Sequence, residues 1–471
     1  MSANGWEPVV GLEIHVQLKT RTKMFCRCEN VGGGEPNTRT CPVCLAHPGT
    51  LPVPNKRAIE WTVKLGLALG CDIAARALFH RKNYFYPDLP KGYQISQYDV
   101  PLASAGHFAV PGPDGADHVI GIVRAHLEED AAKTIHVGGA AGRIHGAEAS
   151  LVDFNRGGTP LVEIVTQPDV RSGEEARRFL QLLRQTVVEL GISDAEMEKG
   201  SLRCDANVSV RRAGETGYRT KTELKNMNSF KFVADGIAAE VERQVGRYEH
   251  GEEVVQQTLH FDPQQGTIQP LRSKEEAHDY RYFPEPDLVA VEPPAGLVEA
   301  MRAGIGELPA DRIRRLEAGV GFDLGYDLVT SGRDGLYARV PGDDRRAIAN
   351  VLMNQLAAAG VDPEAVNGEE LGKLGEARER IPRQAFLDAL AASGDQDFAA
   401  DRYLAETAVT DASALDPVID AILAANPGQA EAYRGGKEGL LGFFVGQVMK
   451  ETQGKADPRV VNERLREKLG A

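Results

Sequence analysis

The sequence predicts an α+β protein with three parts: a domain built on a largely antiparallel sheet, a helical domain and a small all-helical tail. Up to about residue 293, segments with a two-residue hydrophobic alternation are mixed irregularly with helical patterns. From residue 294 onward the spacing is that of short helices broken by Gly or Pro. A chain of 471 residues also exceeds one ordinary core. We therefore expect domains over residues 1–293, 294–411 and 412–471.

Five segments of the first domain alternate between apolar and polar residues, so each predicts a strand with one face on a core. They are VVGLEIHVQL, HVIGIVRAHLEED, TPLVEIV, LRCDANVSV and TKTELKN. Two segments with helical spacing lie among them, EEARRFLQLLRQTVVELG and FKFVADGIAAEVERQVGRYEHG. The first predicted helix begins after Ser172 and Gly173 and ends at Gly191.

Beyond the Pro-rich boundary at residues 292–294 the helical patterns are shorter. RAIANVLMNQLAAAG and IPRQAFLDALAASG fall in the second domain. In the tail, helices are predicted in LDPVIDAILAANPGQAEAYRGG, GLLGFFVGQVMKE and PRVVNERLREKLG. Turns are predicted at Asn426-Pro427-Gly428 and Asp457-Pro458.

Composition excludes several classes of protein. Hydrophobic residues make up 42% and charged residues 26%, as in soluble globular proteins, and no apolar run approaches the roughly 18 residues of a membrane helix. The first residues show no secretory signal, so we expect a cytoplasmic protein. The net charge of -14 argues against a dedicated nucleic-acid coat. However, residues 292–411 hold 22 acidic and 13 basic residues whereas residues 412–471 hold 8 of each, which permits a local RNA contact in the tail.

Acidic and histidine side chains recur on the predicted strand faces. Glu13 and His15 share a face, about 6–7 Å apart, so they could converge on one divalent metal or form an ordinary exposed polar face. The segment His126-Leu127-Glu128-Glu129-Asp130 places three acids beside a histidine. Glu163 lies inside an apolar run, where an unpaired carboxylate is costly, so a metal or a cation is expected beside it.

Such a face suits an ATP-dependent reaction, because oxygen ligands hold Mg²⁺ while Arg and Lys stabilise phosphate charge. Arg203, Asp205 and Lys225 are candidates for nucleotide binding on the neighbouring predicted strands. No Walker loop and no GxGxxG motif after a strand is present. Arg156, Gly157 and Gly158 form the best candidate for a phosphate cradle, with a tight turn between strands as the alternative.

The cysteines give the most specific local signal. Cys26 and Cys28 are followed, after twelve residues, by Cys41 and Cys44. Four thiolates in two close pairs around a loop predict a closed structural zinc site, against unliganded thiols or a redox pair.

Cations are interleaved with aromatics in RKNYFYPD, in KGYQ and again in HDYRYFPEPD, which begins at His278 and Asp279. This combination suits stacking on bases or holding the single-stranded end of an RNA, although aromatic residues are also ordinary core material.

Seven strings in order along the chain are similar to signature segments of the glutamyl/aspartyl-tRNA amidotransferase B subunit family. They are VVGLEIHVQLKT, RKNYFYPDLPKGYQISQYD, HLEEDAAK, LVDFNRGGTPLVEIV, GSLRCDANVSV, ELKNMNSF and DYRYFPEPDL. The C-terminal string GGKEGLLGFFVGQVMKETQGKADPRVVNERL also resembles that family. The resemblance thus covers nearly the whole chain.

The resemblance implies a glutamine-hydrolysing carbon–nitrogen ligase that works as part of a heterotrimer. A catalytic cradle would use ATP to phosphorylate glutamate on tRNA(Gln), or aspartate on tRNA(Asn), and ammonia from an amidase A subunit would then form the amide. A small C subunit completes the complex, and the tail reads tRNA. Glu13, His15, Glu129 and Glu163 match the family's magnesium motifs, with Glu128 as a neighbouring acid that stays open. The four cysteines match a zinc site that only some members carry.

Two other functions are compatible with parts of the sequence. A carboxylate–amine ligase acting on a free amino acid would account for the acid-lined sheet but gives the tail no role. A non-catalytic tRNA-binding scaffold would make the acids structural. Neither accounts for the ordered set of motifs.

Overall fold

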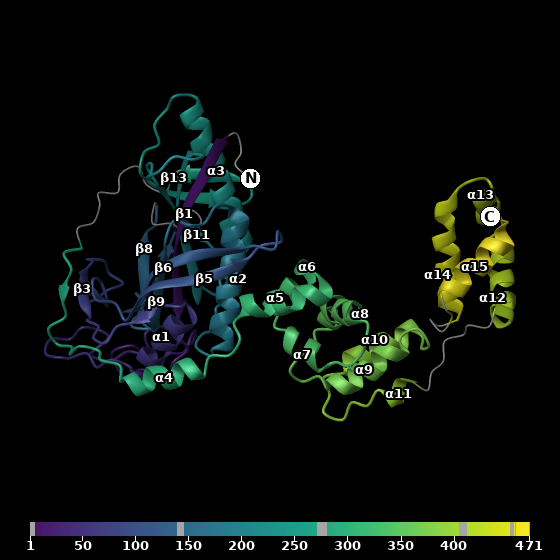
Figure 1. Ribbon diagram of the computed structural model, residues 1–471, viewed down its shortest axis with the longest axis horizontal. Coiled ribbons are helices and arrows are strands. Elements are labelled where there is room, and N and C mark those ends of the chain that lie inside the picture. The colour runs from purple at the N-terminus through teal and green to yellow at the C-terminus, as the bar shows by residue number, and fades with distance from the viewer. Residues whose placement is uncertain are drawn as a thin grey trace. The chain divides into compact units, whose positions relative to one another are not determined.

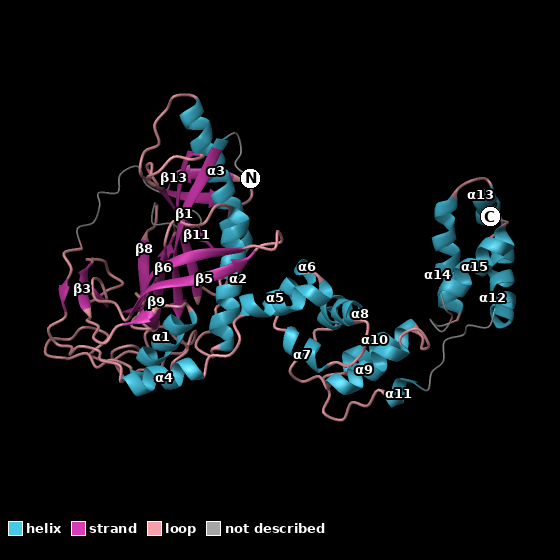
Figure 2. Ribbon diagram, in the orientation of Figure 1, coloured by secondary structure: helices cyan, strands magenta, loops and turns pink. Residues whose placement is uncertain are grey.

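The computed structural model describes residues 5–138, 146–270, 280–404, 412–452, 456 and 458–470. The chain forms two compact units, residues 1–312 and 313–471. The first unit mixes sheet and helix and the second is helical, so the predicted α+β class is confirmed (Figures 1 and 2). The three-part division at residues 293 and 411 stays a prediction.

The first unit is built on a nine-stranded sheet with the order β13-β12-β11-β10-β1-β9-β6-β5-β2. All neighbouring strands are antiparallel except β11 and β12. The strand bounds are β1 Trp6–Gln17, β2 Asp72–Ile73, β5 Ala103–Pro111, β6 Asp117–Glu129, β9 Pro160–Thr166, β10 Leu202–Arg212, β11 Thr222–Met227, β12 Thr258–Asp262 and β13 Thr267–Pro270. All five strands predicted from alternation are therefore present, and they are consecutive in the sheet in the order β11, β10, β1, β9 and β6.

The alternation of β1 separates a core face from a polar face. Leu12, Ile14 and Val16 are at most 1% exposed, whereas Glu13 and His15 lie on the opposite face. The core side is covered by helices, including α1 (Lys56–Ala68), α2 (Gly173–Glu189) and α3 (Phe230–Glu249). Both predicted helices of this domain are thus confirmed as α2 and α3.

Helices α2 and α3 pack closely on each other and on the sheet. The Ser172 hydroxyl accepts a hydrogen bond from the Glu175 N–H and so caps α2. A Cβ at Gly173 would lie 2.1 Å from the carbonyl oxygen of Ala234, so only glycine permits this approach of the two helices. On α3 the fully buried Glu240 accepts hydrogen bonds from the Thr222 hydroxyl of β11 and from Arg243.

Two smaller sheets flank the polar side of the first unit. One has the order β14-β3-β4, with β3 His80–Asn83, β4 Tyr93–Ser96 and β14 Phe283–Pro284. The other is the hairpin of β7 (Lys133–Val137) and β8 (Ala149–Asp153). Helix α4 (Ala295–Ala303) also belongs to this unit.

The second unit consists of short helices, as the sequence predicts. Its helices are α6 Phe322–Thr330, α7 Asp334–Arg339, α8 Arg345–Asn350, α9 Gly368–Ala377, α10 Arg383–Ala392, α11 Asp401–Leu404, α12 Ala412–Ala425, α13 Pro427–Arg434, α14 Leu441–Glu451 and α15 Pro458–Leu469, while α5 Pro309–Val320 crosses the boundary between the units. The RAIANVLMNQL segment forms α8 and then a π-helical turn over Val351–Leu356.

The last four helices share a core of their own. Leu415, Ile419, Phe444, Val461 and Leu465 are at most 1% exposed and pack together. No helix of the described residues is long and apolar enough to cross a membrane.

Candidate active site

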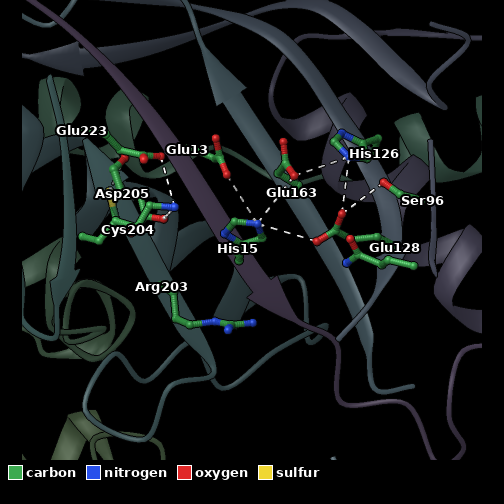
Figure 3. Close-up of polar contacts among 12 residues, drawn as sticks. Glu13, His15, Ser96, His126, Glu128, Glu163, Arg203, Cys204, Asp205 and Glu223 are labelled. Carbon is green, nitrogen blue, oxygen red and sulfur yellow. Dashed lines mark hydrogen bonds and ion pairs between the residues drawn. The ribbon is translucent and has the colours of Figure 1, made fainter. Parts of the chain in front are cut away.

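Three carboxylates from three adjacent strands meet around His15. Its Nε2 atom lies 3.8 Å from Glu13 Oε1, 3.6 Å from Glu128 Oε1 and 3.5 Å from Glu163 Oε2 (Figure 3). Strand register explains the meeting, because His15 pairs directly with Glu163 on β9, which in turn pairs with His126 on β6. Directly paired residues project on the same face of a sheet.

His126 extends this group on the far side of Glu163. Its Nε2 lies 3.7 Å from Glu163 Oε2 and 3.8 Å from Glu128 Oε2, and all three residues are buried. The Ser96 hydroxyl donates a 3.1 Å hydrogen bond to Glu128. Two sets of possible metal ligands share Glu163, and the ligand atoms of each set lie within 4.8 Å of one another: Glu13, His15 and Glu163, and His126, Glu128 and Glu163. We call Glu13, His15, His126, Glu128 and Glu163 the carboxylate–histidine cluster.

The carboxylates of the cluster favour positive charge beside them. Burial disfavours the charged imidazole, but the hydrogen bond to Glu163 and the neighbouring carboxylates raise the pKa of His15 to about 9. Burial alone would raise the pKa of Glu163, but the neighbouring His126 and His15 hold this pKa well below its ordinary value. Burial and the charge of Glu163 raise the pKa of Glu13. Three carboxylates around one imidazole therefore form a site able to hold a divalent cation, and carboxylate ligands favour a hard ion such as Mg²⁺.

The structure does not bring Glu129 to this cluster. Glu129 is adjacent to Glu128 on β6, so its side chain leaves the opposite face of the strand. Its carboxylate forms an ion pair with Lys91 and accepts a 3.0 Å hydrogen bond from the Ile95 N–H. It lines a cavity of about 220 Å³ together with Gly158, Cys26 and Cys44. Glu128 thus occupies the place expected for Glu129.

The sequence prediction did not place His126 in the metal site, and it left Glu128 open as a neighbour of Glu129. The two-residue period of a strand was the available signal: His126 and Glu128 share a face, and Glu129 does not. The motif resemblance makes no such distinction between two adjacent acids.

The predicted nucleotide-binding residues of β10 and β11 continue the polar face. Asp205 pairs with Glu13 and Arg203 with His15 across the β1–β10 ladder. Lys225 Nζ lies 3.8 Å from Asp205 Oδ2. Burial raises the pKa of Asp205, and the charge of Lys225 opposes that shift.

The predicted phosphate cradle forms a tight turn between β8 and β9. The Gly158 N–H donates to the Asp130 carbonyl, with a φ of +85° at Gly158 that favours glycine. Arg156 donates to the carbonyls of Ala131 and Ala132 at 2.9 and 2.8 Å. These groups are already hydrogen-bonded within the protein, so the geometry agrees better with the alternative, a structural turn. Gly157 lies in the same turn.

The four predicted zinc ligands come together. Cys26, Cys28, Cys41 and Cys44 place their Sγ atoms within 4.8 Å of one another. The Cys44 Sγ lies 4.0 Å from Cys28 Sγ and 3.9 Å from Cys41 Sγ. Sulfur atoms around a tetrahedral zinc with Zn–S of about 2.3 Å are about 3.8 Å apart, so the residues fit this metal. The hydrogen bond from Cys26, and the ammonium of the fully buried Lys23, lower the pKa of Cys44 to about 5.

The aromatic segments noted in the sequence converge on the β14-β3-β4 sheet beside the cluster. Lys82 is partly buried there, and although burial opposes it, the carboxylates of Glu128 and Glu163 raise its pKa. His278 and Asp279 lie outside the described residues.

The fold and the geometry define an α+β chain with a carboxylate–histidine site able to hold a divalent metal, and a separate four-cysteine metal site. A family model described as the GatB/GatE catalytic domain matches residues 8–299, and one described as the GatB domain matches residues 348–469. The chain belongs to the GatB/GatE family, as its motifs predict.

Relatives similar over their full length carry one name. A protein of Moorella thermoacetica is 46% identical, over 98% of this chain and 100% of its own length. One of Anaeromyxobacter dehalogenans (strain 2CP-1) is 45% identical over 100% of both chains, and one of Halorhodospira halophila is 46% identical over 98% of this chain and 99% of its own. Each is named as the B subunit of an aspartyl/glutamyl-tRNA(Asn/Gln) amidotransferase.

Proposed function

We propose that this chain is the B subunit of a cytoplasmic tRNA-dependent amidotransferase and that its carboxylate–histidine cluster is the amidation site. The observation that carries the proposal is the meeting of Glu13, His15, Glu128 and Glu163 inside a domain of this family. The names of the full-length relatives support the same activity.

The reaction must first make a carboxylate electrophilic. The side-chain carboxylate of glutamate or aspartate on tRNA attacks the γ-phosphorus of ATP, which gives an acyl phosphate and releases ADP. Ammonia then attacks the acyl carbon, and phosphate leaves as the amide forms. Positioning and exclusion of water are the main contributions that a protein makes to such chemistry.

In this proposal the cluster residues hold Mg²⁺ through Glu13, His15, Glu128 and Glu163, with Glu128 replacing Glu129 in the set expected from the motifs. When bound, Mg²⁺ would neutralise phosphate charge. Arg203 and Lys225 continue the same face and are suited to hold phosphate oxygens. Asp130 orients Arg203 at 2.9 Å, while Glu223 at 3.2 Å and Asp205 at 3.8 Å orient Lys225. The Arg156–Gly158 turn would support the end of the sheet without binding phosphate.

Three further parts complete the proposal. The four-cysteine site would hold zinc for structure, because four ligands leave no open position for catalysis. Ammonia would come from a separate amidase A subunit, with a small C subunit in the same complex. The helical tail would contact tRNA(Gln) or tRNA(Asn).

The test is to purify the chain with its amidase partner and to supply ATP, glutamine and each mischarged tRNA. Glutaminyl-tRNA(Gln), asparaginyl-tRNA(Asn) or both should form, and Glu163→Gln should abolish amide formation while glutamine hydrolysis stays measurable. ATP-dependent amidation of free glutamate without tRNA would contradict the proposal. So would wild-type amidation rates in both Glu163→Gln and Glu128→Gln with saturating ammonia.

A further inference from the structure

Two aromatic segments far apart in the sequence are joined in the β14-β3-β4 sheet. Phe283 pairs with Arg81 across the β14–β3 ladder. The Asn83 amide donates a 2.9 Å hydrogen bond to the Tyr280 carbonyl. The tyrosines that follow β4 and precede β14 are thereby brought together.

Tyr98 and Tyr282 form a parallel stack at this junction. Their ring centroids are 4.3 Å apart and the rings are inclined by 10°. One face of Tyr98 is thus covered by Tyr282, yet the residue remains 52% exposed. The buried His80 contacts Tyr98 edge-on at 6.4 Å, and its Nε2 lies 3.0 Å from Asp99 Oδ1. An exposed ring held in a fixed orientation provides a flat surface for another ring.

The support beneath the stack is rigid. Arg81 donates two hydrogen bonds, of 2.7 and 2.8 Å, to Glu285, whose side chain is fully buried. Because side chains alternate along β3, Arg81 anchors one face while His80 and Lys82 belong to the other. Tyr98 lies two residues after β4 and Tyr282 directly before β14, so the paired strands hold the segments that carry both rings.

Lys82 connects this surface with the carboxylate–histidine cluster. Its Nζ lies 5.0 Å from the centroid of the Tyr280 ring, a cation–π contact, and Tyr280 meets Tyr282 edge-on at 6.1 Å. The charges of Glu128 and Glu163 raise the pKa of Lys82, so its ammonium lies within electrostatic range of the cluster. A ligand ring on the stack would thus lie near a cation that is also close to the cluster.

We propose that the Tyr98–Tyr282 stack is a subsite for an adenine ring, whose attached phosphate or ribose ester is directed toward Lys82 and the cluster. Aromatic stacking accepts any base, so the identity follows from the substrates. This step rests on the proposed function: both nucleotide substrates carry adenosine, one as ATP and the other as the terminal nucleoside of the tRNA 3′ end. The stack binds the adenine ring of one of them.

The experiment compares, in the full-length chain, ligands with and without the adenine. One arm measures binding of ATP against ribose 5-triphosphate, which lacks only the adenine, both with Mg²⁺. The other arm measures binding of tRNA that ends in CCA against the same tRNA with an abasic terminal nucleotide. In the wild type, loss of the adenine should weaken one ligand by about 5- to 100-fold, the effect of losing one base–aromatic stack. In Tyr98→Ala the ratio of the affinities with and without the adenine should fall to about one, as in a double-mutant cycle.

Two variants serve as controls. Tyr98→Phe keeps the ring and should keep the adenine dependence. Tyr218→Ala removes another exposed tyrosine, 73% exposed in the β10–β11 connection, and should behave as wild type. If Tyr98→Ala loses the adenine dependence of ATP binding, the subsite binds ATP. If it loses the adenine dependence of tRNA binding, the subsite binds the 3′ end. Unchanged adenine dependence of both ligands in Tyr98→Ala overturns the inference. Because binding is measured without turnover, this failure is distinct from a failure of amide formation.

Discussion

Single carboxylates on the polar face differ in the charges that surround them. Glu163 has His15 and His126 on either side and Arg124 Nη2 at 3.4 Å, so its charge is well compensated. Glu13 is less compensated, and burial together with the charge of Glu163 raises its pKa. A like charge nearby disfavours the ionised carboxylate, and a divalent cation beside Glu13 and Glu163 would offset that repulsion.

The cysteine site predicts about one tightly bound zinc per chain, because four converging thiolates bind zinc in preference to other available ions. Elemental analysis of protein purified without added metal measures this content. Replacing Cys41 and Cys44 together by Ser should remove the zinc and lower the melting temperature.

The control is Cys71→Ala. Cys71 lies outside the site, so this variant should retain zinc. Wild-type protein that is free of zinc, with all four thiols open to titration, would exclude the assignment.

Residue-level sequence reasoning succeeded where spacing alone determines geometry. The Cys26–Cys28 and Cys41–Cys44 pairs had to meet because each pair is locally close and one short loop joins them. Glu13 and His15 were correctly placed on one strand face. The two-residue period separates Glu128 from Glu129, but which of the two faces His15 follows from the register of β6 against β9, which the motif does not contain.

At the level of elements, polar pairs hold the first residues of β1. Near its start, Glu7 accepts from Arg211 of β10 at 3.0 Å and pairs with Arg171, just before α2, at 2.8 Å. These contacts fix β1 against its neighbour at the end opposite to the cluster. The register that brings His15 opposite Glu163 is set by the same ladder.

Glu7→Gln should lower the melting temperature near neutral pH but not in acid. The hydrogen bond from Arg211, and then the charges of Arg211 and Arg171, lower the pKa of Glu7 from its ordinary 4.5. The ionised carboxylate therefore stabilises the fold above pH 4.5, and this stability is lost as pH falls through the lower folded-state pKa. Melting curves of both proteins at pH 7 and near pH 3 measure it. An equal difference at both pH values would contradict this account.

The long strands were predictable because their alternation is a local signal. The β14-β3-β4 sheet was not predicted, since its strands have only 2 to 4 residues and β14 joins β3 from about 200 positions away. The pairing of aromatic segments that gives the Tyr98–Tyr282 stack is likewise a long-range event. The parallel pairing of β11 with β12 also lies beyond local pattern.

At the level of the whole molecule, the chain is acidic, but its tail, residues 412–471, has as many basic as acidic residues. Two of its cations are used within the tail: Arg464 pairs with Asp416, and Lys468 pairs with Asp416 and Asp420. These pairs join α15 to α12 around the shared core. Because Arg464 and Lys468 are already paired with acids of the tail, an RNA contact would use other basic groups of residues 412–471.

Removal of residues 412–471 should weaken tRNA binding and reduce its dependence on salt, because fewer phosphates are neutralised. The first unit, residues 1–312, has its own core and should keep its melting temperature. Filter binding or anisotropy at two salt concentrations measures the affinity. Unchanged tRNA affinity in a folded truncation would refute a role for the tail.

In the proposed site, Glu128 holds the catalytic cation together with Glu13, His15 and Glu163. Titration of the full-length chain with Mn²⁺, a paramagnetic substitute for Mg²⁺, tests it most directly when Glu128→Gln is compared with Glu129→Gln. The two acids are adjacent on β6 but face opposite sides of the sheet. Glu128→Gln should weaken Mn²⁺ by at least about tenfold, since even the loss of an outer-shell partner costs that much. Glu129→Gln should leave the affinity within about twofold of wild type. Wild-type affinity in Glu128→Gln, or a larger loss in Glu129→Gln, would contradict the account.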